Sequence, residues 1–116
     1  MWFDVGGIEI VGDRWNDDSA RTLQAWVDGS DVRIPTLRTE GSRAPTFESA
    51  LLVLHSGGDA DIVVPDHRRH GPGEAARYVP VFDSATPDGR PASTEPVASG
   101  SSVRVRGPIV LVYVSL

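Results

Sequence analysis

Short apolar segments of strand length, separated by turn-rich intervals, constrain the fold of this chain more than any other feature of its sequence. The most β-prone of them is PIVLVYVSL, Pro108 to Leu116, in which β-branched and aromatic residues predominate. No stretch shows convincing helical periodicity, and the nearest candidate, GEAARY at residues 73–78, is short. The sequence therefore predicts an all-β protein.

Residues 22–29, TLQAWVDG, alternate with the period of two that is typical of a half-buried strand. One face carries Leu23, Ala25 and Val27, and the other carries Thr22, Gln24 and Trp26. Residues 50–55, ALLVLH, form a continuous apolar run, which predicts a strand covered on both faces. The polar turn Ser56–Asp59 then predicts a hairpin into residues 61–65, where Pro65 ends the strand.

The remaining segments complete a β-sandwich. In RYVPVFD, residues 77–83, Pro80 predicts an edge position or a bulge, because proline donates no hydrogen bond to a sheet. In SVRVRG, residues 102–107, the valines face one way and the arginines face solvent. Residues 84–101 are typical of a long loop within one domain. We expect one domain, residues 1–116, folded as an antiparallel β-sandwich of Greek-key type with about seven to eight short strands.

Charge and composition exclude several classes of function. The net charge of −5 disfavours a nucleic-acid partner, because phosphate contacts depend on clustered basic residues. No apolar run approaches the roughly 18 residues of a membrane span. The absence of cysteine excludes thiolate metal sites and suits a reducing cytoplasm, where we expect the protein to reside.

Adjacent carboxylates at Asp17 and Asp18 are the first candidates for catalysis or metal binding. Acid–base catalysis needs two carboxylates a few ångströms apart across a cleft, in unequal environments. Sequence neighbours rarely meet that condition, because successive side chains on a strand point to opposite faces. Asn16 and Ser19 flank the pair, and such a cluster is typical of a turn. We therefore predict a turn.

The histidines and serines also give no catalytic signature. Asp66, His67 and His70 lie close in sequence, but a structural metal site usually has four ligands, and the intervening arginines would repel a cation. We predict a solvated loop there, and at His55 a hydrogen-bonded histidine at the end of a strand. No nucleophile elbow or phosphate-binding loop is present. The sequence predicts no catalytic, cofactor-binding or metal-binding residue and no cofactor.

Trp2, Trp15 and Trp26 are the last candidates, because exposed aromatic rings can stack on sugars. In a small β-sandwich, tryptophans are more often core or interface residues, which is the interpretation we favour. A sugar-binding platform is the alternative.

Three segments of the chain follow one another in a characteristic order. The first carries a Trp-Phe pair, a Gly-x-Glu turn, an acidic residue before a Trp, Ala-Arg-Thr-Leu and a glycine turn. These stand at Trp2–Phe3, Gly7–Glu9, Asp13–Trp15, Ala20–Leu23 and Asp28–Gly29. The second is FESALLVLHSGGDADIVVP, residues 47–65, and the third is residues 79–116. In this order, the three segments resemble the C-terminal region of bacterial glycogen debranching enzymes of the isoamylase type, in the α-amylase superfamily. The chain departs from the family at the turn His55–Gly58 and in the loop before Glu48.

The resemblance implies a non-catalytic domain. The family hydrolyses α-1,6 branch linkages of glycogen with carboxylates on a barrel that precedes this segment, and no position here matches their motifs. Residues 1–18 would form the junction to that barrel, with Trp2, Phe3 and Trp15 against it. The implied partner is the barrel, in the same chain or a separate one, and branched α-glucan is a second candidate partner. A free-standing glucan-binding β-sandwich is the alternative function.

Overall fold

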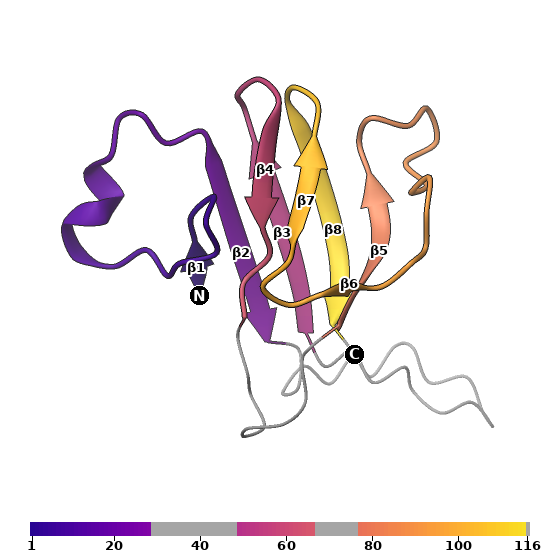
Figure 1. The fold of residues 1–116 in the computed structure, drawn as a ribbon, viewed down its shortest axis with the longest axis horizontal. Coiled ribbons are helices and arrows are strands. Elements are labelled where there is room, and N and C mark those ends of the chain that lie inside the picture. The colour runs from indigo at the N-terminus through magenta and orange to yellow at the C-terminus, as the bar shows by residue number, and fades with distance from the viewer. Residues whose placement is uncertain (29–48, 67–76, 116) are drawn as a thin grey trace, which may run out of the picture.

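The computed structural model describes residues 1–28, 49–66 and 77–115, which form two antiparallel sheets packed face to face (Figure 1). A six-stranded sheet has the order β1-β2-β3-β8-β5-β6, and a two-stranded sheet pairs β4 with β7. The strands are β1 (Trp2–Phe3), β2 (Thr22–Asp28), β3 (Ser49–His55), β4 (Ala60–Val63), β5 (Arg77–Asp83), β6 (Val97–Ala98), β7 (Ser102–Val105) and β8 (Ile109–Ser115). The only helix in these ranges is the 3-10 helix η1 (Gly12–Asn16). The predicted all-β sandwich is confirmed.

The last strand, β8, occupies the centre of the large sheet. It pairs with β3 along its whole length and with β5 on its other side. Neither neighbour of β8 is therefore consecutive with it in sequence, as in Greek-key connections. The strong β preference of PIVLVYVSL is explained by this position, because a central strand gains packing on both sides as well as two ladders of hydrogen bonds.

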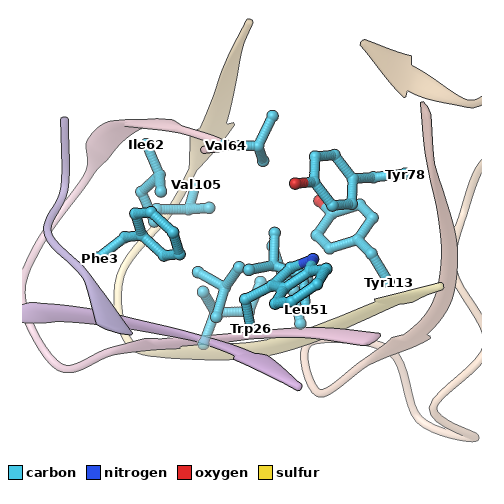
Figure 2. Packing of buried hydrophobic residues seen from close by; sticks show 11 residues of the cluster. Phe3, Trp26, Leu51, Ile62, Val64, Tyr78, Val105 and Tyr113 are labelled. Atoms are coloured by element: carbon cyan, nitrogen blue, oxygen red, sulfur yellow. The ribbon is translucent and has the colours of Figure 1, made fainter. Parts of the chain in front are cut away.

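Side chains from both sheets meet in one hydrophobic core (Figure 2). Trp26 and Leu51 project from the six-stranded sheet toward Ile62 and Val105 on the two-stranded sheet. Tyr78 and Tyr113 close one side of the core with an edge-to-face contact, their ring centroids being 6.3 Å apart. The buried Tyr78 hydroxyl donates to the Pro65 carbonyl at 2.8 Å, so its polar atom is satisfied.

Phe3 closes the opposite side of the core, and this corrects the expectation that it lies on an exposed surface. The pairing of Phe3 with Gln24 turns both side chains to the inner face of the sheet. Phe3 is only 5% exposed and belongs to the core cluster. Trp2, its neighbour, points to the opposite face and is 43% exposed.

Asp4 fixes the conformation of the N-terminal segment through hydrogen bonds and an ion pair. Both carboxylate oxygens of Asp4 are engaged, because Oδ1 accepts the N–H groups of Gly6 and Ile8 at 2.9 Å and Oδ2 pairs with Arg14. The loop then reaches the second sheet, since Val63 N donates to Val5 O at 2.9 Å. Gly7 (φ +74°) approaches so closely that a Cβ would lie 2.9 Å from the Val63 oxygen. Only glycine fits there without strain.

Pro80 lies where the sequence predicted an edge or a bulge. β6 pairs only with Arg77 and Tyr78, so beyond Tyr78 the far side of β5 has no neighbouring strand among the described residues. The pairing of β5 with β8 shifts by one residue between Pro80 and Phe82. Both interpretations of the proline are confirmed.

Two expectations for residues 50–63 were wrong. The predicted hairpin does not form, because β3 pairs with β2 and β8 whereas β4 pairs with β7 in the other sheet. The turn that contains Gly57 and Gly58 therefore crosses between sheets, so that the inward-facing residues of both strands share one core. Within the described residues, β3 is also fully buried on one face only, since its residues alternate between buried and partly exposed. Within residues 73–78, the helix candidate, Arg77 and Tyr78 begin β5, and the rest lies outside the described residues.

Candidate functional site

The face of the six-stranded sheet that is turned away from the two-stranded sheet is apolar across the four long strands β2, β3, β8 and β5 and the short strand β1. Directly paired residues in a sheet point to the same side, so the register aligns side chains in rows. Three rows share this face: Leu23–Leu54–Val110, then Trp2–Ala25–Leu52–Val112–Phe82, and then Val27–Ala50–Val114–Val79. We call these residues the outer face. In Figure 1 it is turned from the viewer, behind β4 and β7.

Apart from Ala25, which is buried, the residues of the outer face are partly exposed, whereas the inner face of the same strands is buried. Leu51 and Val53 of β3 are at most 1% exposed, but Leu54 is 38% exposed. Val27 and Phe82, near the ends of the rows, are 51% and 40% exposed. The core cluster includes none of the outer face. A contiguous apolar patch of this kind usually marks an interaction site.

Sequence reasoning missed the outer face, although its signal was present. The run ALLVLH predicts a strand covered on both faces. In the structure the described residues cover one face, so the apolar character of Ala50, Leu52 and Leu54 has no explanation in the core. The same is true of the alternate valines of β8.

One end of the outer face deepens into a pocket of about 410 Å³. Leu23, Leu54 and Val110 of the outer face line it from the sheet, and Ile10 and Trp15 line it from the N-terminal segment. Trp15, on η1, is 51% exposed and meets Trp2 edge-to-face, with ring centroids 6.0 Å apart and an interplanar angle of 74°. The pocket therefore adjoins an exposed pair of aromatic residues, Trp2 and Trp15. The third tryptophan, Trp26, is buried in the core.

Asp17 and Asp18 form a turn at the mouth of this pocket, as the sequence predicted. Asp17 Oδ1 accepts hydrogen bonds from the N–H of Ser19 at 2.9 Å and from its hydroxyl at 2.5 Å. The hydroxyl bond, then the backbone bond, and more weakly the charges of Arg14 and Arg21, hold the pKa of the Asp17 carboxyl below its ordinary value. An exposed carboxylate with a lowered pKa is a poor proton donor, so this geometry gives no acid–base pair.

His55 is the hydrogen-bonded residue at the end of a strand that its position predicted. It is 8% exposed, with Nδ1 2.8 Å from the Thr22 hydroxyl and Nε2 2.6 Å from the Gly58 carbonyl oxygen. A carbonyl only accepts, so Nε2 carries the proton, and in the neutral ring Nδ1 accepts from Thr22. Both nitrogens are thus used in fixing the turn after β3.

The other candidates give no further site. His67 and His70 lie outside the described residues, and Asp66 accepts a hydrogen bond from the Ser99 hydroxyl at 3.0 Å. No group of three or more histidine, aspartate or glutamate side chains within residues 1–28, 49–66 and 77–115 is arranged to hold a metal ion. The same ranges contain no helix long and apolar enough to cross a membrane.

Comparison of the sequence with models of known protein families finds no match, and comparison with curated proteins finds none either. The resemblance to debranching enzymes is therefore carried by the three segments alone. The interpretation of function depends on that resemblance and on the outer face with its pocket.

Proposed function

We propose that this chain is the non-catalytic C-terminal β-sandwich domain of a cytoplasmic glycogen debranching enzyme and that it packs on and stabilises the catalytic barrel. The observation that supports this is the outer face. An apolar patch of this extent on the side away from the core is often functional, and a domain that covers a partner needs such a surface. Trp2 brings the first strand onto this face, so a barrel joined ahead of β1 would lie beside it.

The size of the outer face supports a partner in the same polypeptide. β2, β3, β5 and β8 each have seven residues. Strands about 4.8 Å apart with a rise of about 3.3 Å per residue then give a face of about 440 Å². Stable complexes between separate chains bury about 800 Å² on each partner. Interfaces between linked domains can be smaller, because the linker supplies a high effective concentration.

The proposal is tested by joining the barrel to this domain. The barrel region of an isoamylase-type debranching enzyme, without its own C-terminal domain, is expressed alone and as a fusion that continues into residues 1–116. We expect the barrel to unfold at a higher temperature in the fusion than alone, and we expect Leu52→Asp, which places a charge at the centre of the outer face, to abolish the gain. Arg106→Asp, at an exposed position after β7 in the opposite sheet, is the control. If the fused barrel gains no stability, the proposal is wrong.

We also predict that the isolated chain hydrolyses no glycosidic bond, because its described residues provide no pair of carboxylates across a cleft. The measurement is the release of reducing ends from branched α-glucan. Turnover that follows the purified protein through its last chromatographic step, and is lost on unfolding, would contradict the proposal.

A further inference from the structure

The pocket beside Trp15 is more specific than the flat outer face that it adjoins. We infer that it receives one bulky apolar side chain of the partner domain, as the anchor of the interface. The inference rests on the proposed function for the identity of the partner, but the kind of group that fits follows from the pocket itself.

The lining favours an apolar side chain over a sugar. Leu23, Leu54, Val110 and Ile10 present aliphatic surface, and Trp15 adds one face or edge of an indole ring. Thr22, His55 and Ser56 also line the pocket, but their side chains are hydrogen-bonded to one another or to backbone carbonyl oxygens. A glucose unit placed there would press hydroxyl groups against aliphatic carbon, and each hydroxyl that loses water without gaining a partner costs free energy. An aromatic or large aliphatic side chain has no such cost. The volume of about 410 Å³ has room for one.

Polar groups at the mouth complement a polypeptide backbone. Arg21 uses Nη1 to donate to the carbonyl oxygens of Asp18 and Ala20, both at 3.0 Å. Within the described part of the chain, its Nε and Nη2 donate to no carboxylate, and Asp17 Oδ2 accepts no hydrogen bond. The mouth therefore offers donors at Arg21 and an acceptor at Asp17. A peptide segment whose side chain enters the pocket carries carbonyl and N–H groups that match both.

Arg14, the second cation of the lining, is already neutralised. It pairs with Asp4 and donates to the Glu9 carbonyl at 3.3 Å, which holds η1 against the N-terminal loop. The Arg14 contacts thus fix the position of the helix that carries Trp15, and the Trp15 ring contacts Trp2 of the outer face. A pocket whose aromatic side chain is already held in place suits an interface anchor, because binding there costs little conformational entropy.

The occupant is a linked domain and not a second copy of this chain. The outer face of about 440 Å², estimated from strand spacing, is about half of what one partner buries in a stable complex between separate chains.

The test uses blocked amino acids as probes of the pocket in the isolated chain. Uniformly ¹³C,¹⁵N-labelled protein is titrated with N-acetyl-phenylalaninamide, with N-acetyl-glycinamide and with maltoheptaose. We expect the phenylalanine probe to bind with a dissociation constant on the order of millimolar, typical of so small a ligand. Its shifts should be confined to the Trp15 indole N–H and the methyl groups of Leu23, Leu54 and Val110. The glycine probe and the sugar should leave these signals in place.

Leu54 and Leu52 give a matched pair of variants. Both are partly exposed on β3 and point to the outer face, but only Leu54 lines the pocket. Leu54→Ser should weaken the phenylalanine probe by at least about tenfold, the usual cost of removing an anchor contact. Leu52→Ser should leave it unchanged.

Several results would overturn the inference. They are equal shifts with the glycine probe, no shifts with the phenylalanine probe, or saturable shifts with maltoheptaose at these signals, which would assign the pocket to α-glucan. Shifts of the Trp15 indole N–H, which lies outside the outer face, with protein concentration alone would assign the pocket to a second copy. Failure here leaves barrel binding through the outer face intact, and failure of barrel binding leaves the chemistry of the pocket intact, so the two tests separate the two proposals.

Discussion

At the scale of single residues, Gln24 shows why polarity alone did not identify the buried face of β2. Its side chain is fully buried, and Nε2 donates to the carbonyl oxygens of Asp4 and Val63, both at 2.8 Å. The amide thus ties the N-terminal loop and the second sheet to β2. The face shared by Leu23 and Val27 is more apolar, yet it lies outside the core. A period of two assigns residues to faces, but it does not say which face the rest of the fold covers.

Replacement of Gln24 tests this role. Gln24→Glu would place a carboxylate against two carbonyl oxygens in a buried site, and we expect a loss of about 3 kcal/mol or more in the free energy of unfolding at neutral pH. The loss should shrink at acid pH, because a protonated carboxyl recovers one donor. Gln24→Met, which buries no charge, is the control and should show no such pH dependence. Urea unfolding at several pH values measures both; equal losses in the two variants at every pH would refute the role.

Tyr78 makes stability depend on alkaline pH. Its burial, with a smaller effect from the charge of Asp66, raises the pKa of Tyr78 from 10.0 to about 12. The folded state therefore holds this proton more tightly than the unfolded state. That contribution is fully present below pH 10 and is lost as the pH rises toward 12, by at most about 2–3 kcal/mol. Tyr78→Phe should flatten the decline in unfolding free energy over this range. An unaltered pH profile would show that the ionisation of Tyr78 does not matter; Tyr113, whose pKa burial also raises, would account for any residual slope.

At the scale of the secondary-structure elements, the strands were predictable and their partners were not. The strands β2, β3, β5, β7 and β8 follow the alternation and turn residues of the sequence closely. The hairpin after His55 was wrong because a short polar turn fits a crossing between sheets as well as a hairpin. In the structure, Ile62 and Leu51 belong to one core cluster but come from opposite sheets. That choice is made by packing between distant segments, which local sequence does not record.

Deletion of residues 109–116 tests the central position of β8. The deletion separates β3 from β5 and removes three buried apolar side chains, those of Ile109, Leu111 and Tyr113. Each contributes roughly 1.5–3 kcal/mol, and together they approach the whole stability of a small domain. We expect the truncated chain to lose its β-rich circular dichroism spectrum and its cooperative thermal transition. Cooperative unfolding at an unchanged midpoint would show that β8 is dispensable.

At the scale of the whole molecule, the candidate site was only partly predictable. The sequence indicated that tryptophans near the N-terminus mark an interface, and it excluded the aspartate pair and His55 on grounds that the structure supports. It did not locate the outer face, because that surface exists only when β2, β3, β8 and β5 are aligned in register. Sequence also did not distinguish the two residues of β1, of which Phe3 faces the core and Trp2 faces away from it.

The outer face predicts how the free domain behaves in solution. Without a barrel to cover it, this apolar surface should drive weak, reversible self-association, because a face of about 440 Å², estimated from strand spacing, is too small for a stable dimer. Substitution of two exposed valines tests whether association depends on the outer face or on exposed apolar residues in general. Val27 lies on the outer face and is 51% exposed, whereas Val11 lies outside it and is 57% exposed. In a two-fold dimer each substitution acts twice, so Val27→Ser should weaken association by roughly tenfold or more, and Trp2→Ser should do the same. Val11→Ser should have no effect. Sedimentation equilibrium over a range of protein concentrations measures all four proteins, and equal effects of the two valine substitutions would mean that the outer face is not the surface that associates.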